Sequence, residues 1–64
     1  MIIETFEGHM VNNFYLRKYY IIRGANDKYN VFAEFKNGDT IVLQVYKTRP
    51  EAEKHLVEIK DGQE

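Results

Sequence analysis

Two segments of alternating apolar residues, on either side of Lys36-Asn37-Gly38, constrain the fold more than any other feature of the chain. Apolar side chains recur at every second position over residues 29–35, and they do so again over residues 41–45. Two segments with a period of two, joined through Asn-Gly, are the strongest short-range signal for a β-hairpin in a single sequence. The sequence therefore predicts a hairpin over residues 29–46.

The pairing within this hairpin follows from matching apolar with apolar side chains, because directly opposed residues point to the same face of a sheet. A two-residue loop would place the apolar set of one strand beside the polar set of the other. A three-residue loop, residues 36–38, matches the two apolar sets and puts glycine where the backbone needs a left-handed φ. We therefore predict a type I turn with a G1 bulge. The predicted pairs are Ala33 with Ile41, Val31 with Leu43 and Tyr29 with Val45.

Residues 15–23 are rich in Tyr and Ile and predict a further strand. Residues 24–27, Gly-Ala-Asn-Asp, are turn formers and predict the loop that leads back into the hairpin. The three strands then form an antiparallel meander. The predicted pairs are Arg23 with Lys28, Ile22 with Tyr29, Tyr20 with Val31, Arg17 with Glu34 and Leu16 with Phe35.

A helix start signal follows the third strand. Thr48 with Glu51 three residues later forms a capping box, and Pro50 suits the first helical turn. We expect the helix to run to about Lys60, where Gly62 lies just beyond as a stop signal. Its apolar side chains Ala52, Leu56 and Ile59 would cover one face of the sheet. The predicted fold class is α+β, in β-β-β-α order, with one C-terminal helix on one face of a three-stranded antiparallel meander.

The chain divides into an N-terminal arm (1–14), the β-β-β-α domain (15–61) and a short tail (62–64). In the arm, the apolar spacing partly fits a helix, but Gly8 and the pair Asn12-Asn13 argue against a stable one. Residues 2–7 could equally form a short strand that turns at Gly8-His9. We expect this arm to dock on another surface.

Composition narrows the function classes. A chain of 64 residues forms one domain and buries only about 60% of its unfolded surface, so it often relies on a partner or a second copy. It has no cysteine, no signal peptide and no apolar stretch near the roughly 20 residues of a membrane span. We therefore expect a cytoplasmic protein that does not enter a membrane. Its net charge of −1 lacks the strong basic excess that is typical of nucleic-acid-binding domains.

The sheet face opposite the helix is the candidate binding surface. A solvated face is normally polar, whereas this one is predicted to carry aromatic and apolar side chains. Three explanations stay open: the arm covers the face with Ile3, Phe6 and Met10, a second copy packs on it, or a foreign partner binds it. The predicted binding residues are Tyr15, Arg17, Tyr19, Ile21, Phe32, Val42 and Tyr46.

Nucleic acid is the alternative partner. Tyr15, Tyr19 and Phe32 could then stack on bases, while Arg17, Arg23 and Lys28 contact phosphates. The junction of residues 46–53, Tyr-Lys-Thr-Arg-Pro-Glu-Ala-Glu, after a three-stranded meander, resembles the N-terminal arm-site DNA-binding domain of tyrosine integrases. The resemblance covers residues 15–59 by topology and these eight residues by motif. It implies a sheet that enters the major groove, with basic side chains on phosphates.

Catalytic residues are scarce. The only imidazoles, His9 and His55, have no second metal ligand at a typical spacing, and the glutamates of the helix are interleaved with lysines. The chain has no serine, and Thr48 is assigned to the helix cap. We expect no enzyme activity, no metal and no cofactor. The sequence thus favours a small non-catalytic interaction module that binds a protein partner or forms a homodimer, with nucleic-acid binding as the alternative.

Overall fold

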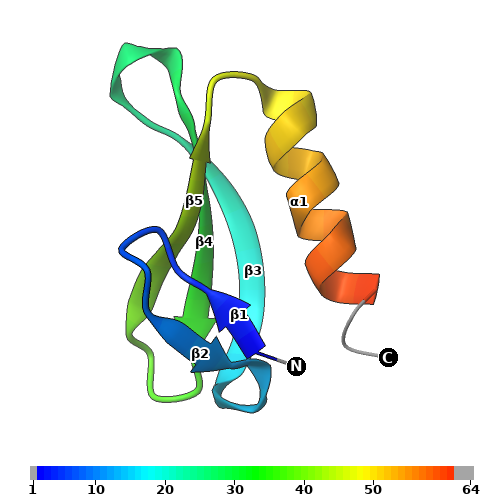
Figure 1. The fold of residues 1–64 in the computed structure, drawn as a ribbon. Coiled ribbons are helices and arrows are strands. Elements are labelled where there is room, and N and C mark those ends of the chain that lie inside the picture. The colour runs from blue at the N-terminus through cyan, green and yellow to red at the C-terminus, as the bar shows by residue number, and fades with distance from the viewer. Residues whose placement is uncertain (1, 62–64) are drawn as a thin grey trace.

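The structure is a computed structural model that describes residues 2–61 (Figure 1). Its elements in chain order are β1 (Ile2–Glu4), β2 (Met10–Asn12), the 3-10 turn η1 (Asn13–Tyr15), β3 (Leu16–Arg23), the 3-10 turn η2 (Ala25–Asp27), β4 (Tyr29–Phe35), β5 (Thr40–Tyr46) and α1 (Arg49–Asp61). Strands β3, β4 and β5 form an antiparallel sheet in that order, and α1 follows β5. The predicted α+β fold with a three-stranded meander and a C-terminal helix is confirmed.

The N-terminal arm forms a small hairpin of its own. Strands β1 and β2 pair antiparallel in a separate two-stranded sheet. In the turn between them, the Thr5 N–H donates to the His9 carbonyl at 2.7 Å, and Gly8 has a φ of 88°. The Thr5 hydroxyl accepts a hydrogen bond from the His9 N–H at 3.1 Å, which satisfies this buried side chain. The strand alternative for the arm is therefore confirmed, and a helix there is wrong.

The tip of the main hairpin has the predicted three-residue loop. The Phe35 N–H donates to the Asp39 carbonyl at 2.7 Å, and the Gly38 N–H donates to the Phe35 carbonyl at 3.0 Å. Gly38 has a φ of 98°, in the region that glycine adopts without steric cost. Near this tip Ala33 pairs with Ile41, as the apolar pattern predicts.

Helix α1 begins within one residue of its predicted start. The Thr48 hydroxyl donates to the Glu51 carboxylate at 2.9 Å, and the Ala52 N–H donates to the Thr48 carbonyl at 3.4 Å. The hydrogen bond between Thr48 and Glu51 is therefore one between two side chains. Because Ala52 and Ile59 are buried, the apolar stripe of the helix faces the sheet as expected.

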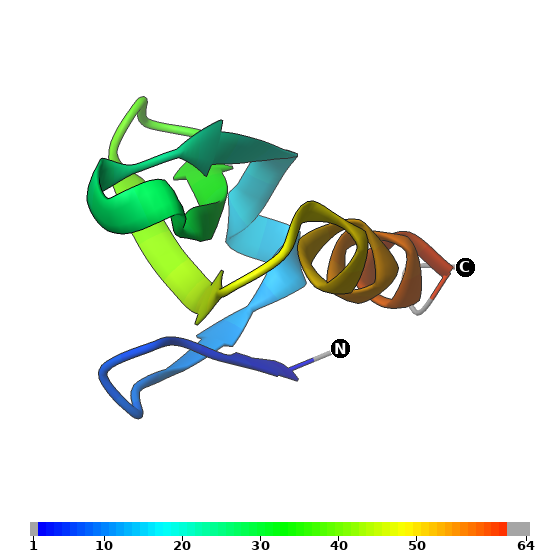
Figure 2. The same cartoon turned by 90° about the horizontal axis from the view of Figure 1, so that it is seen from above.

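The core lies on one side of the sheet. Helix α1 contacts β3, β4 and β5, and the β1–β2 hairpin flanks the same side beside it (Figures 1 and 2). Among the described residues, the buried apolar side chains come from both sheets and from the helix. They are Ile3, Leu16, Val31, Ala33, Leu43, Ala52 and Ile59.

The register of β3 against β4 differs from the prediction. Arg23 pairs with Tyr29 instead of Lys28, because the connecting loop is one residue longer than predicted. Asn26 and Asp27 adopt φ values of 60° and 56° in this loop, a conformation that Asn and Asp tolerate better than most residues. A β-bulge at Arg17 then restores the predicted pairing of Leu16 with Phe35.

The shifted register exchanges the two faces of β3. Tyr19 pairs with Ala33 and Ile21 pairs with Val31, so both side chains point toward the core. The prediction that placed Tyr19 and Ile21 on the opposite face is therefore wrong. The predicted pairs of Tyr20 with Val31 and Ile22 with Tyr29 would have turned Tyr20 and Ile22 toward the core, but both side chains point away from it. A one-residue slip moves every side chain of a strand to the other face.

A second bulge shifts β5 against β4. Phe32 still pairs with Val42, but Val31 pairs with Gln44 and Tyr29 with Tyr46. The predicted pairs of Val31 with Leu43 and Tyr29 with Val45 are therefore wrong. Beside the bulge, the Gln44 side-chain carbonyl accepts a hydrogen bond from the Val45 N–H at 3.0 Å. Tyr46 consequently lies on the core side, and Val45 faces away from it.

Candidate interaction surface

The sheet face that points away from α1 and from the β1–β2 hairpin is here named the outer face. It consists of three cross-strand rows set by the observed register. The charged row is Lys18, Glu34 and Thr40, the middle row is Tyr20, Phe32 and Val42, and the third row is Ile22, Asn30 and Val45.

The middle row is aromatic and apolar. The rings of Tyr20 and Phe32 stack with centroids 5.7 Å apart and an interplanar angle of 12°. Val42 pairs with Phe32 on the neighbouring strand. The side chains of this row are half-buried, and Ile22 in the third row is 45% exposed. The outer face therefore presents a continuous apolar strip to solvent, with Phe32 on the central strand.

The charged row borders this strip at one end. Arg17, in the bulge, donates to the Glu34 carboxylate, and the Lys18 ammonium lies 3.9 Å from the same carboxylate. The side chains of Arg17 and Glu34 therefore form an ion pair, but the predicted pairing of these two residues in the register is wrong, because Lys18 lies opposite Glu34. The Lys18 ammonium also lies 5.5 Å from the Tyr20 ring centroid, within reach of a cation–π contact. The two cations are thus held by one carboxylate and one aromatic ring.

The N-terminal hairpin does not cover the outer face. Ile3 is 6% exposed and belongs to the helix-side core, whereas Phe6 and Met10 are 57% and 66% exposed. The Phe6 N–H donates to the Val42 carbonyl at 3.1 Å, so the turn of the hairpin docks on the edge of β5. The explanation in which Ile3, Phe6 and Met10 bury the second face is therefore wrong.

The structure separates the predicted binding residues into three groups. Phe32 and Val42 lie on the outer face as predicted, with Arg17 beside it. Tyr19, Ile21 and Tyr46 pack against the core on the helix side. Tyr15 lies in η1 at the start of β3, is 59% exposed, and contacts Phe14 edge-on with ring centroids 5.4 Å apart.

Sequence reasoning missed Tyr20, Ile22 and Val45 as outer-face residues. Each follows a bulge or a lengthened loop, which a strict period of two cannot anticipate. The adjacent cations Arg17 and Lys18 were a sequence signal of a bulge, because a regular strand would have turned one of them into the core.

The candidate phosphate contacts are not brought together. Arg17 bonds to Glu34 near the start of β3, and Arg23 bonds to Asp27 at its far end. Six residues of strand separate the two arginines by about 20 Å. Lys28 is exposed in the loop beside Arg23. These side chains therefore do not form one continuous basic patch.

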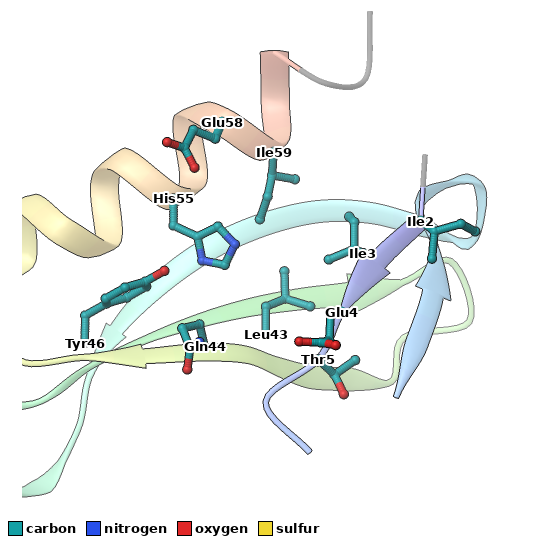
Figure 3. A pocket seen from close by; sticks show the side chains of 10 residues that line it. All are labelled: Ile2, Ile3, Glu4, Thr5, Leu43, Gln44, Tyr46, His55, Glu58 and Ile59. Carbon is teal, nitrogen blue, oxygen red and sulfur yellow. The ribbon is translucent and has the colours of Figure 1, made fainter. Parts of the chain in front are cut away.

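A groove of about 400 Å³ lies on the core side between α1, β5 and β1 (Figure 3). Ile3, Leu43 and Ile59 supply its apolar lining, and Glu4 and Glu58 are its carboxylates. His55 projects from α1 into the groove beside Tyr46, with the two rings edge-on and their centroids 5.6 Å apart. The His55 Nδ1 atom is buried and has no hydrogen-bond partner within residues 2–61.

Burial governs the electrostatics of this groove. It lowers the pKa of His55, while the nearby Glu58 carboxylate acts in the opposite direction. Burial also raises the pKa of the Tyr46 hydroxyl, with further contributions from Glu58 and Glu51. Both side chains are therefore uncharged near neutral pH, and His55 serves as a packing residue against Tyr46.

The part of the chain that the structure describes contains no group of three or more His, Cys, Asp or Glu side chains placed to hold a metal ion. Within the same residues, no helix is both long and apolar enough to cross a membrane. No protein-family model, no curated protein and no solved structure matches this chain.

Proposed function

We propose that this chain is a small, non-catalytic, cytoplasmic interaction module that binds a protein surface, either of a partner or of a second copy, through the outer face. One observation carries the proposal: Tyr20, Phe32 and Val42 form an apolar row that neither α1 nor the β1–β2 hairpin covers. A continuous apolar strip bordered by polar residues is typical of a protein interaction site. The cytoplasmic part of the proposal rests on the sequence alone.

Two features support a protein partner over a small ligand. The strip lies on a sheet and is not enclosed, whereas small-molecule sites are concave and bury most of the ligand. It also combines stacked aromatic rings with a charged border, which is the composition of interface centres and rims. The non-catalytic part of the proposal is supported by the engaged Thr48 hydroxyl and by the packed, uncharged His55.

Site-specific photo-cross-linking tests this function. A benzophenone amino acid replaces Phe32 in cells that make the protein, and a matched variant carries it at Val57, which is 55% exposed on α1. We expect protein adducts, of the chain with itself or with another protein, from position 32 and few from position 57. An absence of protein adducts at position 32, in a variant that retains the wild-type circular dichroism spectrum, would overturn the proposal.

Nucleic-acid binding is the second candidate, and one feature favours it. Phe14 and Tyr15 are 67% and 59% exposed, and the Lys36 ammonium lies 4.1 Å from the Phe14 ring centroid. Exposed aromatic rings next to a cation can stack on unpaired bases. The candidate is less well supported than protein binding because Arg17 and Arg23 are each bonded to a carboxylate.

Salt dependence distinguishes the two candidates. If the sheet contacts phosphates, affinity for nucleic acid should fall steeply as salt rises, and the double variant R17E/R23E should reduce it at least tenfold. An apolar protein contact should change little over the same salt range. Unchanged binding of R17E/R23E to duplex and single-stranded nucleic acid would eliminate phosphate recognition by these arginines.

A further inference from the structure

From the pattern of charges on the outer face, we infer that its partner is a second copy of this chain. The two outer faces stack about a two-fold axis that runs across the strands, so that Phe32 packs on Phe32 of the second copy. This inference rests on the proposed function of the outer face and names the partner. It follows from the order of the three rows and from the position of the charges.

Phe32 lies at the centre of the outer face, on the central strand and in the middle row. A two-fold axis across the strands leaves each strand over its own counterpart and reverses the order of the rows. The two middle rows then overlie one another, with Phe32 at the axis. Offset stacking of aromatic rings at such a centre adds to the apolar contact.

The reversed rows place each charged row over the third row of the other copy. Glu34 then lies over Asn30, whose amide N–H groups can donate to a carboxylate. Lys18 lies over Ile22, along which its aliphatic stem can extend while the ammonium stays in water. No charged group meets its own copy in this arrangement.

The alternative two-fold axis, along the strands, keeps the rows in register. It would place Glu34 over Glu34 of the second copy, and like charges directly opposed are destabilising. With the axis across the strands, the charged rows lie at opposite ends of the interface. The charged row and the third row lie four residues apart along a strand, or about 13 Å. This distance exceeds a Debye length of about 8 Å. The charge pattern therefore selects one of the two arrangements.

The charges also favour a second copy over a foreign partner. The cations Arg17 and Lys18 are already held by Glu34 and by the Tyr20 ring, so they offer little to a complementary charged surface. Electrostatic complementarity usually contributes much of the selectivity for a foreign partner. The outer face instead matches its own reversed pattern of rows.

The outer face is smaller than a typical stable interface. Three strands of about seven residues span roughly 14 by 23 Å, or roughly 300 Å² per copy. A stable interface buries about 800 Å² per partner. We therefore expect a weak dimer in rapid exchange with the monomer.

Sedimentation equilibrium between about 20 µM and 2 mM, on the full chain, tests the inference together with intermolecular NOEs in a mixed sample of labelled and unlabelled protein. We expect the apparent mass to rise toward that of a dimer, with NOEs from the Phe32 ring to the Phe32 ring of the second copy. Ile22→Lys should raise the Kd at least tenfold. Val57→Lys, at an exposed position on α1, should leave it unchanged.

Asn30→Asp tests the arrangement, because it keeps the side-chain shape and places a carboxylate over Glu34 of the second copy. We expect a Kd raised by about three- to tenfold at low salt, with the increase reduced at 1 M salt. An unchanged Kd for Asn30→Asp would overturn the axis across the strands. An amide spectrum with wild-type dispersion shows that each variant remains folded.

The failure of this inference can be distinguished from failure of the proposed function. A wild-type chain that stays monomeric at 2 mM overturns the second copy as partner, while cross-links from position 32 to another protein would still uphold the outer face as an interaction site. A dimer that survives Ile22→Lys uses another surface and overturns the inference. An absence of any protein adduct at position 32 would overturn the proposed function itself.

Discussion

His55 illustrates how burial decides the chemistry of a single residue. From the sequence it is a helix-flank imidazole with no partner, and in the structure its ring packs edge-on against Tyr46 with a buried Nδ1 atom. The protonated form would lose water contacts there without gaining a hydrogen bond at Nδ1. The lowered pKa of His55 is therefore a consequence of packing, although Glu58 partly offsets it.

This shift makes the stability of the fold depend on pH. Because the pKa of His55 is lower in the folded chain than the ordinary value of about 6.5, the unfolded chain binds more protons in the window below 6.5. The stability that depends on neutral His55 is fully present above pH 6.5 and is lost as the pH falls toward the pKa of His55 in the folded chain. We expect His55→Gln to lose less stability than wild type between pH 7.5 and pH 5.5, measured by urea denaturation. An NMR titration that places the pKa of the His55 ring at or above 6.5 would contradict this reasoning.

At the scale of the elements, two bulges decide which side chains reach the outer face. The bulge at Arg17 and the bulge at Leu43 each change the face to which the following residues of their strand belong. Together they move Tyr19, Ile21 and Tyr46 to the core and expose Tyr20 and Ile22. The composition of both faces stays apolar after the exchange, which is why a sequence with period-two patterning is compatible with either register.

Substitutions of the neighbouring residues Ile21 and Ile22 test this register. Ile21 packs against the core, whereas Ile22 is 45% exposed on the outer face. We expect Ile21→Ala to lower the free energy of unfolding by roughly 2 kcal/mol and Ile22→Ala by less than about 1 kcal/mol, because only the first creates a cavity. Chemical denaturation of the two variants measures both losses. A larger loss for Ile22→Ala than for Ile21→Ala would contradict the observed register and favour the predicted one without bulges.

The whole molecule depends on an N-terminal hairpin that lies outside the main sheet. Ile3 is one of seven buried apolar side chains among the described residues, and Val11 packs against the same cluster. A chain of this length has a total stability of roughly 3–10 kcal/mol, so the loss of one such contact is a large fraction of it. The hairpin and α1 together cover one face of the sheet, and neither element covers the opposite face.

Deletion of residues 2–12 should therefore unfold much of the chain at 25 °C. It removes Ile3 and Val11 from the core and the hydrogen bond from the Phe6 N–H to the Val42 carbonyl. Thermal melts followed by circular dichroism check this expectation, with Ile2→Ala as a control because Ile2 is 60% exposed. A truncated chain that melts cooperatively within a few degrees of wild type would show that the hairpin is dispensable.

The sequence by itself determined the order of β3, β4, β5 and α1, the three-residue turn at Gly38 and the helix start near Thr48. Each depends on local chemistry: alternation of apolar residues, a backbone position that suits glycine, and a capping pair three residues apart. Near the main turn, where the register follows from that turn, the pairing of Ala33 with Ile41 was also predicted.

Only the tertiary structure decided which side chains form the candidate site. Register away from a turn is the sum of loop lengths and bulges, and one extra residue reverses every face that follows. The loop before Tyr29 contains two left-handed residues, and beside the bulge at Leu43 the Gln44 side chain accepts a hydrogen bond from the Val45 N–H. Local sequence patterns encode neither feature. The position of the arm was likewise decided by packing, because Ile3 fits the helix-side core and Phe32 and Tyr20 stay on the face that the arm does not cover.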